Sequence, residues 1–168
     1  MLTGVMRDYY TYSEWANERV LEAAGSLSAE QFLESNLEGV WSIRDSLVHI
    51  MVSQWAWIER WNGRIPATYP EEADFPDVAS IRAYWSEVYA GMHALFERFD
   101  DDQLASDLTY TNFKGEQHTY QIWEQLLQVA NHSTYHLGEI AALLTRHRAS
   151  PGELDFLVWQ DGKGRARE

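Results

Sequence analysis

Four long segments of the sequence repeat their apolar residues at the spacing of an amphipathic helix, and this periodicity limits the fold more than any other feature. Residues three and four apart lie on one side of an α-helix, so each segment has an apolar stripe that needs other elements to cover it. The segments run over about Leu2–Ala24, Ile43–Trp61, Ser80–Phe99 and Tyr120–Arg148. We therefore predict an all-α fold, a four-helix bundle with one long connection.

The segments between these helices are predicted to be connections. Residues 62–78 contain three prolines and several acidic residues, so we expect an extended linker there and no helix. Residues 108–113 are rich in Thr and Tyr, and a Lys-Gly pair at 114–115 follows them, which favours a small hairpin before the last long helix. The length suits a single domain over residues 1–168, with a flexible tail from about residue 162 to residue 168.

Charge and cysteine content exclude several classes of function. The chain has 13 Lys and Arg against 26 Asp and Glu, a formal net charge of −13, and no basic stripe. Nucleic acid and anionic membrane are therefore not expected partners. No cysteine is present, so thiol chemistry would need a small-molecule thiol. We see neither a signal peptide nor an apolar run of roughly 18 residues, and we expect a cytoplasmic protein.

Histidine carries the most informative local pattern. His132 and His136 are four residues apart on the last predicted helix, so their side chains stack on one face with Cβ atoms roughly 5–6 Å apart. Two neutral imidazoles at this spacing can bind one divalent metal ion. The same spacing also arises by chance in a chain with six histidines, and from the pattern alone a metal site and a structural pair remain equally open.

The other histidines are not aimed at this pair by periodicity. His49 lies opposite the main apolar stripe of the second helix, beside the small residues Ser53 and Ala56 that leave room for a cavity. Helical phase alone does not direct it towards the last helix. The remaining three, which have neither a local signature nor a suitable spacing, are His93, His118 and His147.

Three motifs, in order along the chain, resemble those of the DinB-like superfamily. Trp41–Ile50 resembles the second-helix signature S-I-R-x-x-L-x-H-I, and Asn131–Ile140 resembles the fourth-helix signature N-H-x-x-x-H-R-G-Q-I. Tyr12–Arg19 is similar to the opening W-A-N-x-R motif, and Asp155–Leu157 also fits the family pattern. The resemblance covers nearly the whole chain, and the order of the motifs makes it specific.

The resemblance implies a four-helix bundle, usually a homodimer, with one divalent metal ion held by three histidines. Carried over residue by residue, these ligands are His49, His132 and His136. Three protein ligands with open positions are typical of a catalytic metal, because a structural zinc normally has four. Zinc or nickel is the leading expectation for the ion, with manganese or iron as alternatives.

This chain departs from the family pattern near the expected ligands. Leu137 and Glu139 stand where the family often has Arg and Gln, and Gln54 stands where it often has an acid. We take Gln54, Asn131 and Glu139 as candidates for orienting the ligands or the substrate, with ordinary capping or solvent-facing roles as the alternative. No catalytic residue is assigned.

The resemblance also suggests a function. Family members include thiol-dependent S-transferases and isomerases, so we expect a metal-dependent S-transferase that uses a bacillithiol- or mycothiol-type thiol in detoxification or stress response. The alternatives are a metal-dependent hydrolase and a non-enzymatic metal- or ligand-binding stress protein. The second helix is apolar on two sides, and three large aromatic residues look exposed: Trp57, Trp61 and Tyr89. Together these apolar surfaces exceed what one small bundle needs to bury, so we expect a homodimer.

Overall fold

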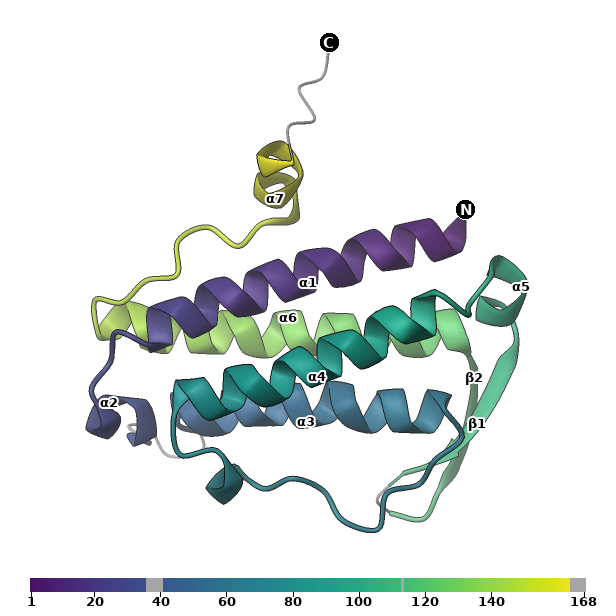
Figure 1. Cartoon of the computed structure of the whole chain (residues 1–168), viewed down its shortest axis with the longest axis horizontal. Helices are drawn as coiled ribbons and strands as arrows, with labels where there is room; N and C mark the ends of the chain where they lie inside the picture. The colour runs from purple at the N-terminus through teal and green to yellow at the C-terminus, as the bar shows by residue number, and fades with distance from the viewer. Residues whose placement is uncertain (36–40, 113, 164–168) are drawn as a thin grey trace.

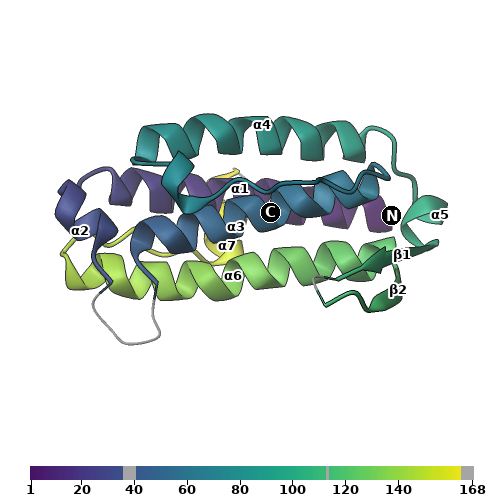
Figure 2. The same ribbon diagram turned by 90° about the horizontal axis from the view of Figure 1, so that it is seen from below.

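The computed structural model describes residues 1–35, 41–112 and 114–163. Its four long helices are α1 (Leu2–Ala24), α3 (Ile43–Trp61), α4 (Val78–Phe96) and α6 (Ile122–Arg146). Helix α1 packs against α6 and α4, and α3 packs against the same two helices (Figures 1 and 2). The predicted four-helix bundle is confirmed.

The long connection follows from the directions of the helices. In Figure 1, α3 and α4 run the same way, so the chain must return along the bundle between them. Residues 62–77 make this return and contain one short 3₁₀ helix, η1 (Glu72–Asp74), where the sequence predicted an extended linker. A turn this short has no periodicity for sequence reasoning to detect.

Side-chain caps set the starts of the central helices. The hydroxyl of Ser42 accepts the backbone N–H of Asp45 at 3.0 Å, which begins α3 as predicted. Asp77 accepts the N–H of Ser80 at 2.8 Å, so α4 begins at Val78, two residues before the predicted start. The last two long helices end earlier than predicted, α4 at Phe96 and α6 at Arg146.

Three further short helices escaped the sequence analysis: α2 (Ala29–Leu33), α5 (Asp101–Leu104) and α7 (Phe156–Gly162). Helix α7 packs on α1, and Trp159 lies with its ring centroid 5.9 Å from that of Tyr12. The flexible tail expected from residue 162 begins within α7, and residues 164–168 of it lie outside the described residues.

A two-stranded antiparallel hairpin, β1 (Asp107–Thr111) and β2 (Gln117–Gln121), precedes α6 as predicted. Gly115 has φ +80° in its turn, a conformation that glycine adopts without strain. The side chain of Gln125 donates to the carbonyls of Leu108 (2.9 Å) and Tyr120 (3.0 Å) and accepts the indole N–H of Trp61 (3.0 Å). One buried amide therefore ties both strands to the α3–α6 seam.

The core lies between the four long helices, with Trp85, Leu47 and Ile140 fully buried. One premise of the homodimer prediction is wrong, because Trp61 is only 7% exposed, and Trp57 and Tyr89 are half-buried. The homodimer itself stays a prediction. Across the described residues, no helix is both long enough and apolar enough to cross a membrane.

Candidate metal centre

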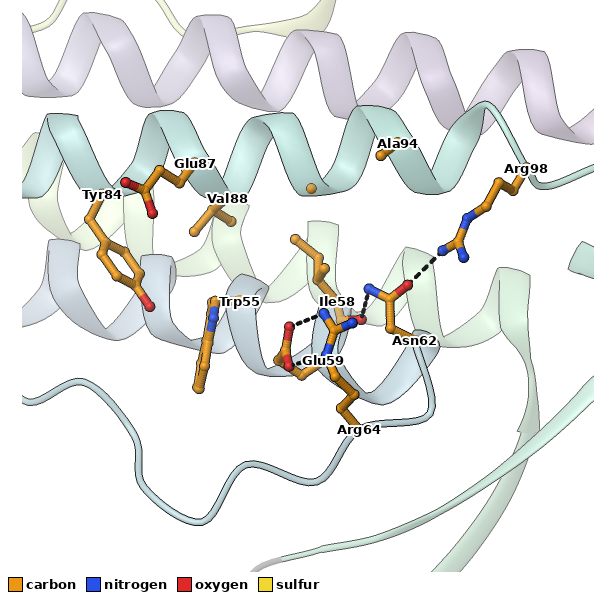
Figure 3. Close-up of a pocket in the computed structure, with 11 residues that line it drawn as sticks. Trp55, Ile58, Glu59, Asn62, Arg64, Tyr84, Glu87, Val88, Ala94 and Arg98 are labelled. Atoms are coloured by element: carbon orange, nitrogen blue, oxygen red, sulfur yellow. Dashed lines mark hydrogen bonds and ion pairs between the residues drawn. The ribbon is translucent and has the colours of Figure 1, made fainter.

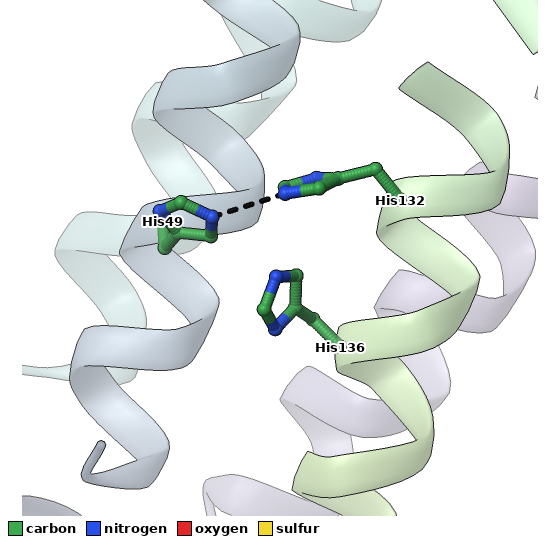
Figure 4. A group of neighbouring side chains, drawn as sticks. All are labelled: His49, His132 and His136. Atoms are coloured by element: carbon green, nitrogen blue, oxygen red, sulfur yellow. Dashed lines mark hydrogen bonds between the residues drawn. The ribbon is translucent and has the colours of Figure 1, made fainter. Parts of the chain in front are cut away.

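The seam between α3 and α6 brings three histidines together (Figure 4). His49 comes from α3, and His132 and His136 come from successive turns of α6. One ring nitrogen from each lies within 4.8 Å of the other two. Nε2 of His49 and Nε2 of His132 are 3.1 Å apart.

The packing of α3 explains why His49 joins the pair. Its own helix buries one side against α4 and another against α6. His49 lies at the outer rim of the α6 side and is half-buried, so its ring reaches across the seam. Helical phase locates a residue relative to its own apolar stripe, but it does not say which neighbour covers the adjacent side.

Burial favours the neutral form of two of these histidines, His132 and His49. Desolvation, followed by the neighbouring His136 and His49, lowers the pKa of His132 to about 4. Desolvation and His136 also lower the pKa of His49. Since an ion binds only the unprotonated nitrogen, both rings are ready to bind one at neutral pH without losing a proton.

Glu139 contacts the third histidine. Its Oε2 lies 2.8 Å from Nδ1 of His136, which leaves the Nε2 of that ring for an ion. Histidines that ligate metals commonly donate their second ring N–H to a carboxylate in this way. Nδ1 of His132, in contrast, is buried and has no hydrogen-bond partner among the described residues.

Trp41 is a site residue to which the sequence analysis gave no role. Its ring centroid lies 4.6 Å from that of His49 and 6.0 Å from that of His136, nearly parallel to the latter at 17°. It stands one residue before the cap of α3, outside the helical pattern. Its position beside the N-cap was the only indication of its place at the site, and an analysis of helical periodicity does not include residues outside the helix.

The other sequence candidates lie apart from the cluster. Gln54 is buried and bonds Ser133 and Trp85, whereas Asn131 is exposed on α6. Each remaining histidine has its own neighbour outside the cluster, and these pairs are His93 with Glu14, His118 with Asn112, and His147 with Glu34.

Two cavities meet at His49. The larger, of about 620 Å³, reaches His49 and His132 and extends to the hairpin. The smaller, of about 210 Å³, extends from His49 to Glu72 and Arg60. Ser53 and Trp57 line both. A third cavity, of about 520 Å³, lies between α3 and α4 and contains no histidine (Figure 3).

The three histidines fit a divalent metal ion. Metal–nitrogen bonds of about 2.0–2.1 Å place the ligand nitrogens of a tetrahedral site about 3.3 Å apart, close to the 3.1 Å between His49 and His132. Three imidazoles form a neutral ligand set, and among the described residues only these three ligand nitrogens converge. Such a donor set suits zinc, nickel or iron and leaves positions for a substrate.

Comparison with known proteins shows the family of this chain and agrees with its fold. A sequence model described as the DinB superfamily matches residues 13–140. The protein DinB of Bacillus subtilis (strain 168) is 23% identical over 154 residues, which are 88% of each chain. A solved structure of YfiT from Bacillus subtilis, described as a probable metal-dependent hydrolase with an unusual four-helix bundle topology, has a TM-score of 0.68. It is 15% identical and the match covers 84% of this chain and 87% of that one. This chain therefore belongs to the DinB superfamily.

Proposed function

We propose that this protein is a divalent-metal-dependent S-transferase, in which His49, His132 and His136 hold the ion. The observation that carries the proposal is the pair of cavities that share His49, Ser53 and Trp57. A transferase must seat two organic substrates beside one reactive centre, whereas a hydrolase seats one substrate and water. The larger cavity has the size of ordinary small-molecule sites.

When bound, an ion at three imidazoles supplies a Lewis acid that lowers the pKa of a coordinated thiol or water molecule. In the proposed reaction, the thiol sulfur forms a bond to an electrophilic carbon, and the bond from that carbon to its leaving group breaks. The leaving group departs with the bonding electrons, and the thiol proton goes to solvent. The absence of cysteine means that no thiol of this chain competes with the substrate.

The protein's own residues prepare this site. Glu139 fixes the ring of His136, and the lowered pKa of His132 keeps its ring free of a proton at neutral pH. Trp41 covers one side of His49 and His136, which limits the approach of water there. Substrates then reach the centre through the two cavities.

A metal-dependent hydrolase is the second candidate, because Glu72 lines the smaller cavity with His49. Its negative charge acts to raise the pKa of His49, against the larger effect of burial, so the carboxylate is electrostatically coupled to the cluster. A carboxylate in that position can accept a proton from attacking water. Thiol activation by the metal needs no such base.

The first experiment is metal content per chain, measured by plasma mass spectrometry on untagged protein. We expect about one ion in wild type and in the matched control His93→Ala, and none in His136→Ala.

The second experiment is turnover of metal-loaded protein with bacillithiol or mycothiol and 1-chloro-2,4-dinitrobenzene. Thiol-dependent product supports the transferase. Cleavage of 4-nitrophenyl acetate without thiol, and dependent on Glu72, supports the hydrolase. A metal-loaded protein inactive in both assays would favour a non-enzymatic binding protein.

A further inference from the structure

The hairpin gives the larger cavity an aromatic wall. Trp57 of α3 and two tyrosines of the hairpin, Tyr110 and Tyr120, line it at the end away from His49 and His132. The hairpin lies beside the start of α6, at one end of the bundle (Figures 1 and 2). The cavity therefore runs from the histidines to a group of flat rings.

The rings are held by contacts behind them. Trp57 and Tyr110 meet edge to face, with centroids 4.8 Å apart and an interplanar angle of 65°. The guanidinium of Arg60 lies 4.8 Å from the centroid of Trp57 and 5.6 Å from that of Tyr110. Arg60 lines the smaller cavity and not the larger, so it supports the rings from the other side.

Hydrogen bonds hold the hairpin against the bundle without a ligand. Gln125 is only 2% exposed, and its amide joins both strands of the hairpin to Trp61. A ligand entering the cavity therefore does not have to order the hairpin, and little binding energy is lost to conformational entropy.

The charges of the cavity disfavour anions. Among the described residues that line it, none is Lys or Arg. Glu124 is the one carboxylate there, and its Oε2 already accepts the backbone N–H of Gln121. The chain as a whole carries a formal charge of −13. At the hairpin end of this cavity, away from the histidines that would hold the ion, an anion would therefore find no opposite charge facing it.

We infer that the larger cavity binds a planar, uncharged aromatic molecule against Trp57 and Tyr110, with one edge directed towards His49 and His132. Stacked and edge-to-face rings gain energy beyond the burial of their area, and this gain requires a flat ligand. The roles of the two cavities rest on the proposed function: the planar molecule is the carbon electrophile, and the thiol enters by the smaller cavity.

The test is binding of 2-naphthol and of its saturated counterpart, decahydro-2-naphthol, to full-length protein treated with EDTA. Ligand-observed saturation-transfer NMR gives both dissociation constants. We expect 2-naphthol to bind about three- to tenfold more tightly, because both compounds have the same carbon skeleton with one hydroxyl group but only 2-naphthol is planar. Equal affinities would overturn the inference.

Paired variants locate the site. Trp57→Leu and Tyr110→Ala should each weaken 2-naphthol about three- to tenfold, while Tyr110→Phe keeps the ring and the affinity. Trp55→Leu is the matched control, because Trp55 is two residues away on the same helix and lines the cavity of Figure 3. Loss of binding in Trp55→Leu alone would place the compound in that other cavity and overturn the inference.

The failure of this inference can be told from failure of the proposed function. Binding is measured without metal, so selective binding of 2-naphthol by a chain that holds no ion supports the cavity assignment while removing the transferase. A chain that holds one ion per molecule but does not distinguish the two compounds overturns the cavity assignment and leaves the metal site standing.

Discussion

Of the polar connections between α3 and α6, two that lie side by side are built in opposite ways. In the first, the Gln54 amide donates to the hydroxyl of Ser133 at 3.0 Å and accepts the indole N–H of Trp85 at 2.7 Å. Ser133 in turn donates to the carbonyl of Val129 at 3.0 Å. This connection is buried, and each of its side chains has a partner.

The second connection is the histidine cluster, about one turn away on the same two helices. Here the rings are half-buried, one buried nitrogen of His132 lacks a partner among the described residues, and two cavities reach His49. A network whose polar groups all have hydrogen-bond partners fixes the packing of the helices. An accessible cluster with an unpartnered polar atom can still bind a ligand. We therefore expect the neighbouring residues His132 and Ser133 to have separate roles, which mutation can separate.

The largest expected effect is the loss of metal from the cluster. His132→Ala removes one of three proposed ligands, and we expect zinc affinity to fall by more than about 100-fold, beyond the usual loss when a residue supporting a ligand is replaced. Competition with a chromophoric chelator measures it. Ser133→Ala is the neighbouring control and should keep the affinity. Equal affinity in wild type and His132→Ala would remove His132 from the site.

Mutation of the buried network should lower the stability of the fold and leave metal binding unchanged. Gln54→Leu leaves the indole N–H of Trp85 without its acceptor in the core, so we expect the free energy of unfolding to fall by about 2–3 kcal/mol. Urea denaturation of EDTA-treated protein measures the change. The folded variant should still bind about one ion per chain. Loss of metal with unchanged stability would show that Gln54 acts on the ligands instead.

The long helices could be predicted from the sequence more completely than the candidate site. The bounds of α1 and α3 were predicted as the structure has them, because long periodic segments with clear ends report their own conformation. The spacing of His132 and His136 likewise lies within one helix. His49 required knowledge of which helix covers its side, and only the family resemblance supplied it. Trp41 reaches the site from outside any helix.

A smaller effect is expected from the residue that orients His136. Glu139→Gln keeps the shape of the side chain but removes the charge 2.8 Å from Nδ1, so we expect zinc affinity to fall about tenfold. The chelator competition described for His132 measures it, with the exposed Asn131→Ala as control. An equal change in both variants would mean that Glu139 does not act through His136.

The smallest expected effect is on the pH dependence of stability. The pKa of His132 is lowered from 6.5 to about 4 in the folded, metal-free protein, so between these values the unfolded chain binds the proton more readily. Stability is therefore present above about pH 6.5 and is lost as the pH falls towards 4. Since the ring is half-buried and solvent screens its charge, we expect a loss on the order of 1 kcal/mol from this group. Urea denaturation of EDTA-treated protein at pH 7 and pH 5 measures it. His132→Asn, which cannot titrate, should lose less stability over this range than wild type, whereas Ser133→Ala should follow wild type. Identical losses in wild type and His132→Asn would mean that the acid sensitivity arises elsewhere, and the contrast between the two connections would then rest on metal binding alone.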